Sequence, residues 1–212
     1  MLRQSAAGTA EATPTLSEVF SPVATDAAAT GFLLAHLRGG TVLWVQDRLS
    51  RREAGQPWPP GFGVTLQMLY LQVGRAADVL WAMEQGLGSP ALTAVVGEVW
   101  GDAPALDFTA TKRLALRAEA HGVAAWLVRR GATPDLSAAR ERWRLSSLPS
   151  ATDPHDLRAP GAPIWRADLF RARWRAPADW VARYDRAGHR LRLEQPVEAV
   201  SEALADRLRG LG

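Results

Sequence analysis

The sequence predicts an α/β protein whose sheet is parallel in its first part and antiparallel at its C-terminal end. In the first part, short runs of apolar residues alternate with segments of helical spacing, which is typical of a parallel sheet with helices on both faces. After residue 138, strand-like segments follow one another with connections too short for a crossover helix, so they are expected to pair antiparallel. A chain of 212 residues with 47% hydrophobic content is long enough to form one such core.

Each element of the parallel part is bounded by turn residues or helix signals. Strands are expected at residues 16–20, 41–45, 69–73, 92–98 and 123–128, with 41–45 and 69–73 as buried strands. Helices are expected around Phe32, Leu33, His36 and Leu37, and at residues 76–85 and 107–121. The last of these is expected to be capped by Asp107 or Thr109 and to end at Gly122. Its apolar side is expected to consist of Leu114, Leu116 and Ala118. The arginine- and proline-rich residues 48–63 are expected to form a long surface loop, not a helix or strand.

The antiparallel part and the two termini complete the expected organisation. Strands are predicted at residues 139–148, 164–174 and 189–193, with 179–184 as a candidate fourth. Residues 1–14 are expected to be a flexible segment, residues 15–195 the core domain, and residues 196–212 an amphipathic helix that either docks on its own domain or binds in a partner's groove.

A phosphate-binding loop is expected between the first strand and the first helix of such a fold, and its residues are absent. That loop needs glycine amides to cradle phosphates and a lysine to reach the terminal phosphate. The turn has no glycine before Gly31, and the one lysine of the chain, Lys112, is far away. We therefore expect no nucleotide cofactor and no catalysis, and a function that depends on contacts with other macromolecules.

Composition excludes several other classes of function. The chain has no cysteine and four scattered histidines, so neither disulfides nor a metal site are expected. It has no apolar run long enough to cross a membrane and no signal-peptide pattern at its start, which favours a cytoplasmic protein.

Charge is distributed unevenly along the chain. Residues 1–110 carry six arginines and ten acidic residues (net −4), and residues 111–212 carry nineteen basic and twelve acidic residues (net +7), which together give the net charge of +3. Because the guanidinium group binds phosphate through two donors, this asymmetry favours an anionic partner for the second half, with nucleic acid first.

Arginines recur at every second position of the predicted antiparallel strands. Alternation puts each set on one face of its strand, above Trp143, Trp174, Leu191 and Leu193. If the strands are neighbours, the arginines form one surface that suits DNA contact without sequence preference; the alternative is an ordinary solvated face. The candidate DNA-binding residues are Arg140, Arg142, Arg144, Arg171, Arg173, Arg175, Arg190 and Arg192.

Tryptophan and the C-terminal segment suggest where a protein partner binds. Trp58 lies in the proline-rich piece and is the tryptophan least expected in the core. The candidate partner-binding residues are Trp58, Val197, Val200, Leu204 and Leu208, whereas Trp44, Trp81, Trp126, Trp143 and Trp174 are expected in the core.

Five segments in order resemble the ImuA family, the first protein of the bacterial ImuA–ImuB mutagenesis cassette: residues 43–48, 53–57, 94–99, 106–114 and 156–166. The resemblance implies a RecA-like (SulA-like) fold with a degenerate P-loop. It also implies a role beside ImuB and an error-prone polymerase in SOS-induced translesion DNA synthesis, with RecA and DNA as further candidate partners. Gln46, Asp47 and Glu98 then fall where RecA-like ATPases hold catalytic and metal-associated acids. We interpret Asp47 and Glu98 as ordinary polar residues at strand ends.

Two alternatives come from other functional classes. A cell-division inhibitor resembling SulA would bind the tubulin-like division protein, but the arginine-rich second half argues against it. A divergent ATPase would need an unrecognised phosphate site, and the missing loop lysine argues against that.

Overall fold

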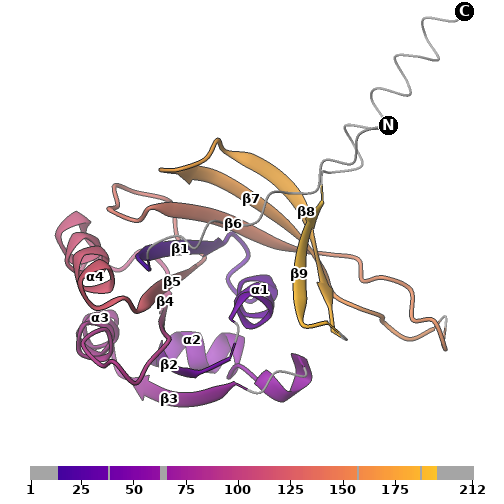
Figure 1. Ribbon diagram of the computed structural model, residues 1–212, viewed down its shortest axis with the longest axis horizontal. Helices are drawn as coiled ribbons and strands as arrows, with labels where there is room; N and C mark the ends of the chain where they lie inside the picture. Colours follow the sequence, from indigo (N-terminus) through magenta and orange to yellow (C-terminus); the bar gives the residue numbers. More distant parts are fainter. Residues whose placement is uncertain (1–13, 38, 63–65, 157, 187, 195–212) are drawn as a thin grey trace, which may run out of the picture.

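The computed structural model describes residues 14–37, 39–62, 66–156, 158–186 and 188–194, and within this part the strands form one nine-stranded sheet in the order β3-β2-β4-β5-β1-β6-β7-β8-β9 (Figure 1). The strands are β1 (Leu16–Ser21), β2 (Thr41–Asp47), β3 (Gln67–Val73), β4 (Ala94–Trp100), β5 (Ala124–Arg130), β6 (Glu141–Leu148), β7 (Ile164–Ala172), β8 (Ala178–Asp185) and β9 (Arg190–Glu194). The helices are α1 (Ala28–His36), α2 (Arg48–Ala54), α3 (Ala76–Gly86) and α4 (Phe108–His121), with a 3₁₀ turn η1 (Pro59–Phe62).

The sheet changes from parallel to antiparallel pairing at β6. All strand pairs from β3 to β6 are parallel, and those from β6 to β9 are antiparallel. This confirms the predicted mixed α/β sheet. Strand β6 pairs parallel with β1 on one side and antiparallel with β7 on the other, so it belongs to both parts.

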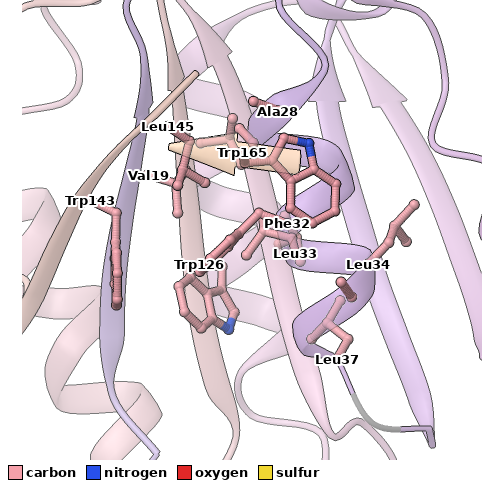
Figure 2. Packing of buried hydrophobic residues seen from close by; sticks show 14 of the residues in the cluster. Val19, Ala28, Phe32, Leu33, Leu34, Leu37, Trp126, Trp143, Leu145 and Trp165 are labelled. Carbon is pink, nitrogen blue, oxygen red and sulfur yellow. The ribbon is translucent and has the colours of Figure 1, made fainter. Parts of the chain in front are cut away.

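Helix α1 covers one face of the sheet, and α3 and α4 cover the other (Figure 1). Figure 2 shows Phe32 of α1 packed among the rings of Trp126, Trp143 and Trp165. Gly31 permits this close packing, because a Cβ atom at its position would lie 2.6 Å from the Trp165 ring. The first glycine after β1 therefore serves helix packing.

The region expected as a long loop begins with a helix. Residues 48–54 form α2, because the Asp47 carboxylate accepts a hydrogen bond from the amide of Ser50 and caps the helix N-terminus. The prolines begin only at Pro57, beyond the end of the helix, and form η1 and its approach. The expectation of a loop was wrong for residues 48–54. It assumed that the prolines prevent a helix throughout the region, but all of them follow the end of α2.

Strand β3 lies at an edge of the sheet, which corrects the expectation of a buried strand. Leu69 and Leu71 are 49% and 39% exposed, since β2 is the only strand that pairs with β3 in the described part of the chain. Three further apolar residues are exposed, contrary to their expected core positions: Trp81 on α3, Leu116 on α4 and Trp174 beyond the end of β7. Their apolar character indicated burial, but their side chains are exposed to solvent.

Tyr184 and His189 connect the β8–β9 hairpin to η1 and to the residue that follows α1. The Tyr184 hydroxyl donates to the Phe62 carbonyl of η1 and contacts His189 Nδ1 at 2.6 Å. His189 Nε2 lies 3.0 Å from the carbonyl oxygen of Leu37, which follows α1. Strand β9 consequently lies beside α1 (Figure 1), and β8 and β9 help to cover the α1 face.

We expect Tyr184→Phe to lower the free energy of unfolding by about 1–2 kcal/mol, because it leaves the Phe62 carbonyl without its donor. The other tyrosine is a matched control: the Tyr70 hydroxyl is buried without a hydrogen-bond partner, so Tyr70→Phe should change stability little. Urea unfolding of the parent and both variants measures this difference. Equal losses in the two variants would contradict the assigned role of Tyr184.

Candidate functional site

The side chain of Arg130 fills the inside of the turn between β1 and α1. This turn is where a phosphate-binding loop is expected in such a fold. This arginine ends β5 and is 1% exposed. Its Nη1 atom donates to the carbonyls of Ala24 (3.0 Å) and Asp26 (2.9 Å), and its Nη2 donates to the Thr30 hydroxyl (2.7 Å). The turn thus presents carbonyl oxygens to an internal cation, whereas a phosphate needs amide N–H groups.

Glu98, an acid in the second half of β4, neutralises Arg130 and is itself buried. One carboxylate oxygen pairs with Arg130 Nε. The other accepts hydrogen bonds from Trp44 Nε1 (2.9 Å) and Gln46 Nε2 (2.8 Å), and Gln46 also donates to the Gly55 carbonyl (3.0 Å). Both oxygens of the Glu98 carboxylate are therefore engaged in contacts within the chain.

Two aspartates at the same end of the sheet also serve the fold. Asp26 accepts a hydrogen bond from the amide of Ala28 at the start of α1 (2.8 Å) and contacts the amide and hydroxyl of Ser147 (2.8 and 2.6 Å). Asp47 caps α2 and accepts from the Trp100 amide (2.9 Å). The N-terminus of α1, which favours an anion, thus already has a carboxylate of the chain.

Two of the three predicted arginine strands are neighbours, and register places most of the arginines on one face. Arg142 lies opposite Arg171 across β6 and β7, whereas β9 pairs with β8, where Arg192 lies opposite Arg183. Strand β8 separates β9 from β7, so the requirement that the arginine strands be neighbours is met for β6 and β7 only.

Arg142 and Arg175 depart from the predicted surface. Arg142 is 3% exposed: its Nε donates to Glu18 at 2.6 Å, so it is a core residue that is not available to a phosphate backbone. Arg175 lies beyond the end of β7, stacks over the Trp143 ring at 5.0 Å and pairs with Glu141 at 3.0 Å. Register gives Glu141 and Trp143 the opposite parity to Arg142, so Arg175 lies on the other face of the sheet.

Acidic residues alternate with the arginines over the exposed part of this face. Arg144 pairs with Asp168 (2.9 Å) and Arg192 with Asp185 (3.3 Å). Arginines outside the predicted set are paired in the same way, Arg166 with Asp179 and Arg183 with Glu194. Such alternation fits the solvated-face alternative for Arg144, Arg190 and Arg192 better than a continuous phosphate-binding stripe.

The other three predicted arginines meet at a groove beside α4. Its volume is about 470 Å³, and its lining combines the basic side chains of Lys112, Arg140, Arg171 and Arg173 with Phe108 and Leu116. Within the described residues no ion pair is recorded for Lys112, Arg171 or Arg173, while Arg140 pairs with Glu119 (2.9 Å). This basic groove is the site in the described structure that best fits an anionic partner.

The acid beside the groove is held in its charged form. Burial acts to raise the pKa of Glu119, but hydrogen bonds from Arg140 and Thr15 and the positive charges of Arg140 and Arg173 outweigh it, so the pKa lies below its ordinary value. Glu119 therefore offsets one of the four positive charges and leaves the others available.

Two parts of this arrangement were not found from the sequence. Lys112 was noted only for its distance from the turn, because the packing of α4 on the sheet, which brings Lys112 to the same groove as Arg171 and Arg173, is a property of the tertiary fold. One feature of the sequence could have identified Arg130. It lies at the end of an apolar strand, where a buried arginine must have a polar or charged partner.

The candidate partner residues divide between described and undescribed parts of the chain. Trp58 is 71% exposed, as expected for a residue outside the core, and lines a hollow beside β3. Val197, Val200, Leu204 and Leu208 lie outside the described residues, as do residues 1–13 and the rest of the expected C-terminal helix. Among the described helices, none is long and apolar enough to cross a membrane.

Glu98→Gln and Arg130→Met should each lower the free energy of unfolding by about 3–5 kcal/mol, because each leaves a buried charge without its counterpart. The double variant should lose less than the sum of the two, since it leaves neither charge. Denaturant unfolding of all four proteins gives the coupling energy. Additive losses would contradict the ion pair.

Comparison with known proteins agrees with the resemblance seen in the sequence. No protein-family model matches the chain. The chain is 31% identical over 167 residues to Protein ImuA of two strains of Caulobacter vibrioides, NA1000 / CB15N and ATCC 19089 / CIP 103742 / CB 15. The match covers 74% of this chain and 65% of each relative, so the chain spans slightly less than two thirds of the relatives' length. This similarity supports a place in the ImuA family.

Proposed function

We propose that this chain is an ImuA-family protein that acts without catalysis in error-prone translesion DNA synthesis induced by DNA damage. Its similarity to the Caulobacter proteins supports the family. The observation that carries the non-catalytic role is the filled β1–α1 turn, where Arg130 and Asp26 take the places that a bound phosphate would need.

The core is proposed to be RecA-like, with a degenerate phosphate loop. A parallel sheet whose first strand leads through a turn into a helix is the layout in which such a loop binds nucleotides. The chain keeps this layout but fills the turn with its own charged groups, so the scaffold serves contacts with other macromolecules in the cytoplasm.

The proposed protein partner is ImuB, with RecA as a further candidate. The Caulobacter relatives are named ImuA, and ImuA is one component of an ImuA–ImuB cassette. The proposed nucleic-acid partner is DNA, bound without sequence preference at the basic groove, because the positive charges of the lining attract the phosphate backbone, which is the same for every sequence.

The two alternatives predict different behaviour. A SulA-like inhibitor would act on the tubulin-like division protein, and its overproduction would make cells grow as filaments. A divergent ATPase would need phosphate binding at the filled turn, which the Arg130 contacts oppose.

The function is tested in the source bacterium by deleting the gene and measuring mutation frequency after ultraviolet irradiation. Damage-induced mutation should fall to the level of unirradiated cells and return when the gene is restored. A variant that replaces Thr30 by alanine, which removes one bond to Arg130 and leaves Glu98 in place, should complement like the parent. Unchanged mutation frequency, or filamentation on overproduction, would contradict the proposal.

DNA binding at the groove should be weak and sensitive to salt. If Lys112, Arg140, Arg171 and Arg173 neutralise about four phosphates of a duplex, the logarithm of affinity should fall with the logarithm of salt concentration at a slope of roughly −3 to −4. Replacing Lys112, Arg171 and Arg173 by serine should flatten this slope by up to about three. Fluorescence anisotropy with a labelled duplex measures the slopes.

The matched control removes three positive charges from ion-paired positions instead. The residues replaced by serine are Arg144, Arg166 and Arg183. This variant should keep a slope close to the parent's, because these arginines are already neutralised within the chain. Equal effects of the two triple variants would show that only the net charge of the protein matters and would reject the groove as a site.

A further inference from the structure

The two edges of the sheet differ in a way that points to a binding function for one of them. The outermost strand β9 is five residues long, and its exposed positions carry Arg190, Arg192 and Glu194. The outermost strand β3 is seven residues long, has the sequence QMLYLQV and carries no charge. Charged side chains are the usual protection of an edge against pairing with another chain, so β9 is protected and β3 is not.

The β3 edge is apolar on both faces of the sheet. Register places Leu69 and Leu71 beside Leu43 and Val45 of β2, on the α3 face, and both leucines are exposed. On the opposite face, Met68 and Tyr70 line a hollow of about 270 Å³ whose other wall includes Trp58 and the neighbouring prolines. An added strand would therefore place apolar side chains against the protein on both faces.

Charge near the edge indicates what the added strand carries. Helix α2 packs against β3 and carries Arg51. Burial raises the pKa of the Tyr70 hydroxyl in the middle of β3, and the positive charge of Arg51 opposes that rise. No ion pair is recorded for Arg48 or Arg51 among the described residues. An unpaired arginine at the edge of an apolar strip attracts a carboxylate.

The same charge argues against a second copy of this chain as the occupant. Antiparallel pairing of two copies about Tyr70 would place the two α2 helices, each of which packs against β3 and carries Arg51, on the same side of the joined sheet, where their like charges would repel each other. A foreign segment meets Arg51 once and can supply the opposite charge.

We infer that β3 is a docking edge, to which a partner protein adds an extended apolar strand with a carboxylate beside Arg51. The inference rests on the proposed partnership with ImuB and names the surface that ImuB uses: the edge of β3, flanked by Trp58 on one face and by Leu69 and Leu71 on the other.

The experiment measures binding of purified ImuB from the same bacterium to the immobilised full chain. Leu69→Lys with Leu71→Lys puts charges on the edge at exposed positions, so the variant should fold as the parent does and bind about tenfold or more weakly. Arg51→Glu should weaken binding and reduce its salt dependence. Val23→Lys with Leu136→Lys is the matched control, because both residues are exposed apolar residues on loops away from β3, and it should bind like the parent.

The outcomes separate the docking edge from the proposed partnership. If the parent binds ImuB and the edge variant binds equally well, the docking edge is wrong and the partnership stands. If the parent does not bind ImuB, both are wrong. If light scattering shows a dimer that the edge variant abolishes, a second copy occupies the edge and the inference is overturned.

Hydrogen exchange gives a measurement that needs no variant. When ImuB binds, the amides of β3 that point away from β2 should exchange more slowly, because the added strand accepts hydrogen bonds from them. Unchanged exchange across residues 67–73 in the complex would overturn the docking edge.

Discussion

A buried ion pair between Glu98 and Arg130 joins the three elements on which the N-terminal half of this protein depends. Glu98 lies two residues before the end of β4, Arg130 ends β5, and the arginine reaches across to the carbonyls of the β1–α1 turn. Neither charge is tolerable alone in the core, so each makes the other necessary. The pair also determines what the turn can bind: its carbonyls point at a cation of the chain, and the Asp26 carboxylate contacts the start of α1.

Because we propose that the β1–α1 turn binds no nucleotide, we assign function to the outer surfaces. The basic groove lies between α4 and the end of the β6–β7 pair, and the uncharged edge of β3 lies at the far end of the strand order. The two surfaces differ in chemistry, since one gathers cations around a partly apolar lining and the other offers backbone groups between apolar side chains. The two contacts that we propose, one with DNA and one with a protein segment, therefore use separate surfaces.

Much of the fold could be predicted from the sequence, because apolar runs and helix caps are local signals. Asp107 and Gly122 bound α4 as expected, and the change from parallel to antiparallel pairing followed from the length of the connections. Exposure was harder to predict. The hydrophobic run of β3 looks the same at an edge as in the centre, and only strand order distinguishes the two. Helix α2 was missed because its cap, Asp47, belongs to the preceding strand.

The candidate site was predicted only in part, for a related reason. Alternation showed correctly that arginines share a face, but the sequence does not show which acid lies opposite each one. Glu18, 124 positions before Arg142, binds that arginine in the core. In the described part of the chain neither Arg171 nor Arg173 forms an ion pair of this kind, and both line the groove. Lys112 joins them only through the packing of α4.

The central claim is that the chain's own charges occupy the place of a bound phosphate. A crystal structure of the protein grown with Mg²⁺ and a non-hydrolysable ATP analogue tests it most directly. The account predicts that Arg130 still bonds the carbonyls of Ala24 and Asp26 and that no phosphate lies at the start of α1. Phosphate groups held by the amides of residues 22–28, with Arg130 displaced, would contradict it.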